Sequence, residues 1–171
     1  MKLNLKIMYI VFIALFFAGC ATFPKTSSEV YSGSSISDDP YTKLISVTSP
    51  RVSSGAVDAI ILVAMKSYKD QNQHTTYSLL VVDYSENWIF YKSARDINGN
   101  VLDVRTMDRK VLGAGLIRES FCIFLSREYL DSASTSGMDI RLEGKRGSNK
   151  IFLPAYFIEG FLKKVDEQIN G

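Results

Sequence analysis

The sequence has few of the residues that most often carry chemistry. Its 171 residues include two cysteines, Cys20 and Cys122, and one histidine, His74. Metal sites favour histidine and cysteine at defined spacings, and His74 stands in a polar stretch without such a partner. A serine or cysteine nucleophile needs a histidine base, and no GxSxG or cysteine motif accompanies His74. We therefore predict that the protein is not an enzyme and that it has no metal and no other cofactor.

A surplus of one charge is also missing. The chain has 20 Lys and Arg residues against 18 Asp and Glu residues. If the first 19 residues are removed, Lys2 and Lys6 leave with them, and the remainder balances at 18 (20 − 2) against 18. A nucleic-acid binder, or a protein held to an anionic membrane by charge, shows a basic surplus or stripe. We therefore expect no nucleic acid partner and no membrane binding through overall charge.

The N-terminus has the layout of an export signal. Lys2 and Lys6 form a basic start, residues 7–18 are an uninterrupted apolar run, and Gly19 leads into Cys20. A membrane-spanning helix needs roughly 20 apolar residues, so this shorter run is expected to be a signal core. The tetrapeptide Phe-Ala-Gly-Cys at positions 17–20 resembles the lipobox of bacterial lipoproteins.

In that family the cysteine is acylated and the signal is cut immediately before it. The resemblance therefore implies a signal peptide over 1–19, lipid attachment at Cys20 and a membrane partner through the anchor. Ala21 stands where inner-membrane members often carry aspartate, so the implied location is the outer membrane, facing the periplasm. The alternatives are an ordinary cleaved signal and an uncleaved anchor. Either would leave Cys20 free for a disulfide with Cys122, which otherwise is expected to be a core residue of the apolar segment FCIFL.

Residues 20–40 are predicted to be the lipidated cysteine followed by a flexible tether. The segment is rich in serine and lacks apolar periodicity. A flexible chain of this length would hold the domain about 25 Å from the anchor on average. The alternative is a strand within EVYSGSSI. The remaining residues, 41–171, suffice for one globular domain.

We predict an α+β fold for that domain: a mainly antiparallel β meander of about seven strands, with a C-terminal amphipathic helix and one short inserted helix. Residues 60–63, 79–82 and 121–125 are apolar at consecutive positions, which predicts strands covered on both faces. Asn98 and Gly99 predict a tight hairpin turn. A two-sheet sandwich with the helix at one end is the alternative architecture.

Two helices are expected from capping and periodicity. Ser126 is a candidate N-cap for a short helix at REYLDSA, and Pro154 suits the start of the C-terminal helix. Gly160 costs about 1 kcal/mol relative to alanine in a helix, which predicts a close approach of this helix to the sheet. The apolar stripe of the C-terminal helix consists of Phe157, Ile158, Phe161, Leu162, Val165 and Ile169.

The order FYKSARDINGN, MDRKV, CIFLSREYL, GKRG and LPAYFIEGFL, between Trp88 and Gly160, is similar to small bacterial lipoproteins without an assigned activity. The similarity implies an architecture and no catalytic residue. GKRG, residues 144–147, lacks the spacing of a phosphate loop and is expected to be a hairpin turn. Trp88, Phe90 and Tyr91 are expected to pack rather than to form a binding surface. The acids Asp96, Asp103 and Asp108 are expected on solvated strand faces.

Two function classes remain. The first is a lipid-anchored cell-envelope protein that acts as a non-catalytic interaction or structural module for an envelope partner. The second is a binding protein for a small apolar ligand or lipid, held in a pocket between sheet and helix. An open apolar pocket of roughly 300 Å³ or more would favour the second class.

Overall fold

The structure, a computed structural model, describes residues 23–67 and 74–170. No helix in these two ranges is long and apolar enough to cross a membrane. The described elements are α2 (Ser27–Gly33), β1 (Ser35–Asp39), β2 (Leu44–Thr48), β3 (Val52–Ser54), β4 (Val57–Ser67), β5 (Thr75–Ser85), β6 (Tyr91–Asp96), β7 (Val101–Val111), a 3-10 turn (Gly113–Gly115), β8 (Ile117–Leu125), α3 (Arg127–Ser136), β9 (Met138–Gly144), β10 (Ser148–Leu153), α4 (Ala155–Val165) and a π-helical turn (Asp166–Asn170).

The strands form an antiparallel arrangement in the order β1-β2-β4-β5-β8-β7-β6-β9-β10, with β3 paired to β4. The predicted α+β class and the mainly antiparallel pairing are therefore confirmed. The predicted strand number is wrong, because the sheet has ten strands rather than about seven. A simple meander is also wrong, since β5 pairs with β8 while β6 pairs with β9. The short strands β1 and β3 carry little apolar alternation, which explains why the sequence pattern did not reveal them.

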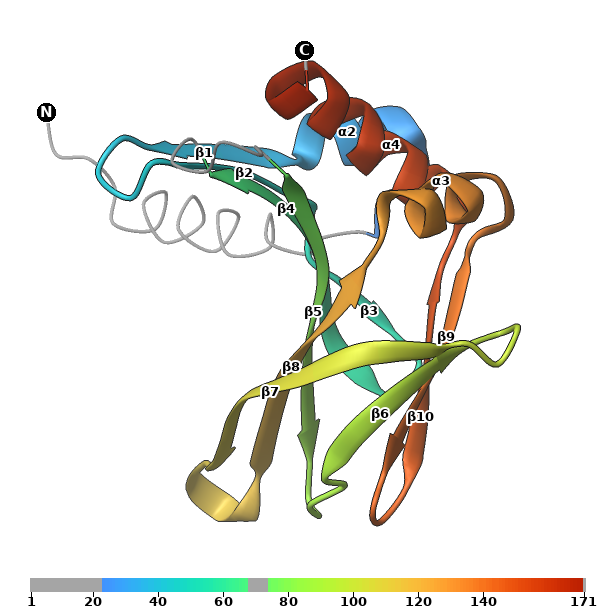
Figure 1. The fold of residues 1–171 in the computed structure, drawn as a ribbon. Helices are drawn as coiled ribbons and strands as arrows, with labels where there is room; N and C mark the ends of the chain where they lie inside the picture. Colours follow the sequence, from blue (N-terminus) through green and yellow to red (C-terminus); the bar gives the residue numbers. More distant parts are fainter. Residues whose placement is uncertain (1–22, 68–73, 171) are drawn as a thin grey trace, which may run out of the picture.

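The sheet curls around a single core, and the helices lie at its upper end in Figure 1. The β10 edge approaches β3, where the backbone N–H of Phe152 donates to Ser54 Oγ at 2.8 Å. At the opposite end lie three connections: β5–β6 (residues 86–90), β7–β8 (residues 112–116) and β9–β10 (residues 145–147). We call these three connections the lower end.

The two expected helices and the expected hairpin are present. The N–H of Tyr129 donates to Ser126 Oγ, which caps α3. Gly99 has φ 84° in the turn between β6 and β7, as a tight hairpin requires. Every residue of the predicted α4 stripe is buried.

Gly160 makes its close approach to α2, not to the sheet as predicted. A Cβ placed on Gly160 would come within 2.3 Å of the carbonyl oxygen of Ser27 and 2.8 Å of the Cβ of Val30. Only glycine therefore allows α4 to pack this closely on α2.

The predicted flexible tether is wrong for residues 27–39. Thr26 caps α2, and Val30 of this helix is completely buried. The alternative strand in EVYSGSSI is wrong for its first half, which is helical, while β1 begins at Ser35. A helix of two turns that buries one residue leaves almost no periodicity, so tertiary contact with α4 decides its structure.

Candidate functional site

The central strands β4, β5 and β8 carry apolar residues on both faces, and the two faces differ in their cover. On one face Leu62, Leu79 and Ile123 face each other in register and are completely buried. On the other face the register aligns Ile61, Leu80 and Cys122, which are half-buried. We call this second face, with Val82, Phe124 and Met107 beside those three residues, the outer face.

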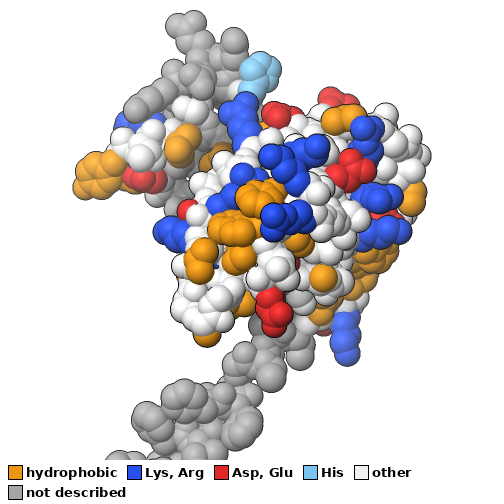
Figure 2. Space-filling view, turned by 90° about the horizontal axis from the view of Figure 1, so that it is seen from below, with side chains coloured by type: hydrophobic (Ala, Val, Ile, Leu, Met, Phe, Trp, Pro, Cys, Tyr) orange, Lys and Arg blue, Asp and Glu red, His pale blue; other side chains and the backbone are white. Residues whose placement is uncertain are grey.

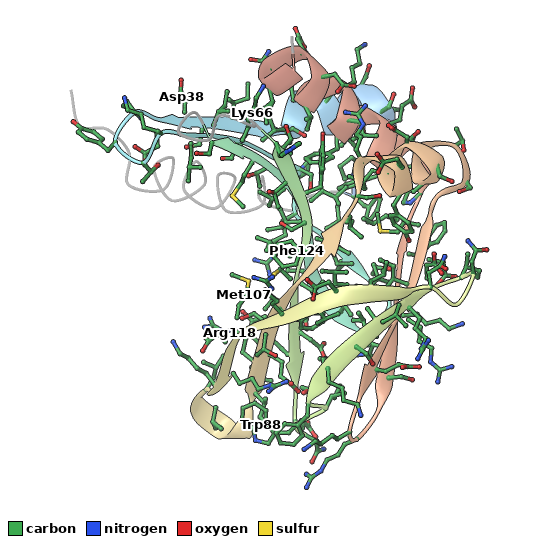
Figure 3. All side chains as sticks on the ribbon, viewed as in Figure 1. Asp38, Lys66, Trp88, Met107, Arg118 and Phe124 are labelled. Carbon is green, nitrogen blue, oxygen red and sulfur yellow. The ribbon has the colours of Figure 1, made fainter. Side chains whose placement is uncertain are left out.

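None of the described helices covers the outer face, because α2, α3 and α4 all lie at the upper end. Met107 is 61% exposed, and Val82 and Phe124 are half-buried. Figure 3 shows Phe124, Met107 and Arg118 along the same side of the sheet. The prediction that these strands are covered on both faces is therefore wrong within the described part of the chain. An apolar run can form a docking face as well as a buried strand, and periodicity does not distinguish the two.

A hollow of about 320 Å³ lies on the outer face. Its lining is largely apolar and includes Ile61, Leu80 and Val82, and Arg51 and Arg118 also belong to it. The hollow is thus amphipathic, with apolar and cationic residues in its lining.

The charges around the outer face are of both signs. Arg118 pairs with Asp108 at 2.5 Å, and this hydrogen bond lowers the pKa of the Asp108 carboxyl below its usual value. The Nε of Arg118 is buried and has no hydrogen-bond partner in the described part of the chain. Arg105 places its guanidinium carbon 4.8 Å from the centre of the Phe124 ring, a cation–π contact.

Two buried carboxylates organise the lower half of the sheet. Glu119 is 2% exposed, and its Oε1 accepts the backbone N–H groups of Ile89 at 2.7 Å and Phe90 at 3.0 Å. Its Oε2 pairs with Arg109 Nε at 3.2 Å. Phe90 has φ 58°, an unusual value for a bulky residue, so these bonds hold a strained backbone in place.

Asp83 is the second buried carboxylate. It accepts a hydrogen bond from the Tyr91 hydroxyl at 2.7 Å, and Asn149 Nδ2 donates to the same hydroxyl at 2.5 Å. Burial raises the pKa of Asp83, and burial together with the neighbouring Asp83 raises the pKa of Tyr91. The Asp83 carboxylate, the Tyr91 hydroxyl and the Asn149 amide bond to one another, so we interpret both titratable groups as structural.

The lower end brings together two segments that the sequence analysis considered separately and assigned to packing and to a hairpin turn. Trp88 stacks on Phe90 with ring centres 5.5 Å apart, and the Arg146 guanidinium carbon lies 5.8 Å from the Phe90 ring centre. The N–H of Arg146 donates to the carbonyl of Ile89 at 3.1 Å. A Cβ on Gly144 would lie 2.3 Å from that carbonyl oxygen, so glycine is required for the contact. Sequence spacing gave no sign of this juxtaposition.

The other residues that the sequence analysis singled out do not form a common site in the described part of the chain. Cys20 and the signal segment lie outside the described residues, while His74 is exposed immediately before β5. Cys122 lies on the half-buried outer face rather than in the core. In residues 23–67 and 74–170, no group of three His, Cys, Asp or Glu residues could hold a metal ion.

The three suggested acids serve local structure. Asp96 accepts the N–H groups of Asn98 and Asn100 in the hairpin turn. Asp103 lies 3.9 Å from Arg105, and Asp108 pairs with Arg118 as described. No pair of these acids is arranged for acid–base chemistry in the described residues.

A second hollow, of about 250 Å³, lies between α3 and the β6–β7 turn. Its lining includes Asp96, Asp139 and Tyr129, and burial together with these two acids raises the pKa of Tyr129 to about 12. This hollow is polar, unlike the apolar pocket between sheet and helix that the sequence suggested. The hollow on the outer face has more apolar lining residues, such as Ile61, Leu80 and Val82.

Comparison with known proteins adds no relative. No protein-family model matches the chain, and no curated protein matches it significantly.

Proposed function

We propose that this protein is a lipid-anchored lipoprotein of the bacterial cell envelope that works by binding an envelope protein through its outer face. Its location is the outer membrane, facing the periplasm, with lipid on Cys20. The observation that supports the binding role is the outer face itself, where apolar side chains of four neighbouring strands remain accessible. Larger exposed apolar patches rimmed by polar residues are typical of interaction sites.

The physical logic of such a module requires no catalysis. Burial of apolar surface contributes roughly 25 cal/mol per Å², and the half-buried residues of the outer face keep part of that surface available to a partner. A lipid anchor confines the domain to a thin layer, which raises its effective concentration for any partner there. A modest contact through one sheet face is then sufficient.

Site-specific photo-crosslinking in the native envelope tests the binding role. A photoreactive residue at Phe124 should crosslink one defined protein, whereas the same residue at Ile97, in the exposed β6–β7 turn, should not. Phe124→Glu, kept on its anchor, should no longer co-purify with the crosslinked protein and should fail to replace the wild-type gene. Phe152→Glu, at a 54% exposed site on β10, is the matched control and should function normally. Equal crosslinking at both positions would contradict the assignment of this face.

The outer-face hollow supports a second candidate function, the binding of a small apolar ligand or lipid. Its volume of about 320 Å³ reaches the lower limit for ligand pockets, and Arg51 would suit an anionic head group. Native mass spectrometry of the protein purified from its own envelope tests this alternative. A discrete bound mass that disappears in Leu80→Arg would favour a ligand, and a ligand-free wild-type protein would argue against one.

A further inference from the structure

The lower end combines apolar and basic side chains from segments far apart in the sequence. Its connections, residues 86–90, 112–116 and 145–147, contain a single acid, Glu86. The first connection contributes Trp88 and Phe90, the second contributes Leu116, and the third contributes Lys145 and Arg146. Figure 2 views the molecule from below and shows hydrophobic side chains with Lys and Arg around them. Figure 3 places Trp88 at this end of the sheet.

The apolar side chains of the β7–β8 hairpin extend into solvent. Val111 is 64% exposed and Leu116 is 39% exposed, and the turn between them is Leu-Gly-Ala-Gly. Apolar side chains at this hairpin tip therefore leave a substantial part of their surface in contact with water. An apolar hairpin tip can insert into the interface of a lipid bilayer, because a bilayer needs no matching groove to accept it.

The charges of this end are also available. Lys92, the second residue of β6, lies next to the first connection. In the described residues no carboxylate pairs with Lys92, Lys145 or Arg146, and all three side chains are exposed. Near an anionic lipid surface each such cation strengthens binding about fivefold. The charge balance of the whole chain conceals this local excess, which arises only when the three connections meet.

The aromatic residues are held rigidly at the lower end of the sheet. Glu119 fixes the backbone of Ile89 and Phe90, and Arg146 N–H bonds to Ile89, so the Trp88–Phe90 stack has a defined position. Tryptophan is enriched where an apolar medium meets water, because its ring is apolar and its N–H is polar. We infer that the lower end is a docking surface for anionic lipid: the β7–β8 tip enters the bilayer interface, Trp88 lies at its boundary, and Lys92, Lys145 and Arg146 contact phosphate head groups.

This contact is separate from an acyl anchor at Cys20. The first described residue, Phe23, packs against Phe157 of α4, at the helical end of the fold. The inference therefore does not depend on the proposed function, and it can be measured with the anchor removed.

The experiment uses residues 20–171 with Cys20→Ser and vesicles of two compositions. Vesicles containing phosphatidylglycerol should bind the protein, while vesicles of phosphatidylcholine alone should bind it far more weakly, and salt should reduce the difference. Trp88 is the only tryptophan, so a shift of its emission to shorter wavelength reports directly on this end. Absence of vesicle binding, or equal binding to both compositions, would overturn the inference, and so would binding without a change in Trp88 emission.

Variants localise the contact. Lys145→Glu combined with Arg146→Glu should weaken binding to the anionic vesicles about 25-fold or more, from about fivefold for each cation. Leu116→Ser should reduce both binding and the Trp88 shift at unchanged charge. Lys25→Glu makes the same type of charge change at the helical end and should bind as the parent does. A loss of about fivefold or more in Lys25→Glu would show that total charge, rather than the lower end, drives binding. A thermal melt confirms that each variant is folded.

Discussion

The ring of Phe23 lies 6.0 Å from the ring of Phe157, which fixes the start of the described chain against the C-terminal helix. The Tyr156 hydroxyl strengthens this contact by donating to the carbonyl of Pro24 at 2.9 Å. Only two residues separate Cys20 from Phe23. Three extended residues span about 10 Å, so an anchor at Cys20 would hold the domain far closer to the membrane than a 20-residue tether would.

We predict that Cys20 carries lipid. Metabolic labelling with a radioactive fatty acid should mark the wild-type protein and should miss Cys20→Ser, because the lipobox resemblance assigns acylation to this cysteine. Cys122→Ser serves as the control and should be labelled as the wild type is. Labelling of Cys20→Ser at the wild-type level would disprove the anchor.

Cys122 should react with a thiol reagent in the purified, folded protein. Its side chain lies half-buried on the outer face, so the reagent can reach it without unfolding. In the intact envelope the reaction should be slower, because the proposed partner covers the same face. Reaction only after denaturation would show that the outer face is closed.

Phe161→Ala should lower the free energy of unfolding by about 3–5 kcal/mol, since the ring is completely buried between α4 and the rest of the core. Urea denaturation followed by circular dichroism measures the change. Phe152→Ala, at a 54% exposed position, removes the same group and should change stability by less than about 1 kcal/mol. Similar losses for the two variants would contradict the docking of α4.

Glu119→Gln should destabilise the protein by about 1–3 kcal/mol, the cost of weakening hydrogen bonds to a buried charged group. The substitution leaves Arg109 without its carboxylate, and it removes the charge that holds the N–H groups of Ile89 and Phe90. Glu143→Gln changes a 33% exposed carboxylate with looser ion pairs and should cost no more than about 1 kcal/mol. If both variants unfold at the same urea concentration, Glu119 does not organise the lower end.

Asp83 should make stability depend on pH in the direction opposite to most carboxylates. Burial raises its pKa, so the native state binds this proton more tightly than the unfolded chain does. The resulting stabilisation is present below about pH 4 and is lost as the pH rises through the raised pKa. Asp83→Asn should therefore gain stability, relative to wild type, on going from about pH 3 to pH 7.

Asp108→Asn is the matched control with the opposite sign. Its hydrogen bond to Arg118 lowers the pKa of Asp108, so the native carboxylate is favoured above its ordinary pKa and this contribution is lost in acid. The variant should lose stability relative to wild type as the pH rises. Urea titrations at both pH values measure the two trends, and the same trend in both variants would refute the role of burial at Asp83.

Local signals in the sequence were sufficient for much of the fold. The Asn98-Gly99 turn, the Ser126 cap and the apolar stripe around Phe161 each act over a few residues, and each appears where the pattern places it. The predicted export signal and the lipobox-like tetrapeptide at residues 17–20 are likewise contiguous, so the proposed anchoring rests on sequence alone.

Tertiary structure decided what those signals left open. A short helix such as α2 is marginal by itself, and it forms because Gly160 admits Val30 against α4. The apolar residues of β4, β5 and β8 follow the same sequence pattern whether one face of the sheet or both faces are covered. Only the placement of the helices at the upper end left Leu80 and Phe124 accessible. Arg146 reached Phe90 across more than fifty residues because two hairpins meet at the lower end. The sequence by itself determined the local turns, the helix cap and the apolar stripe of the C-terminal helix. Contacts between distant segments decided which apolar face of the sheet stayed accessible and which basic side chains came together, because no local pattern encodes such contacts.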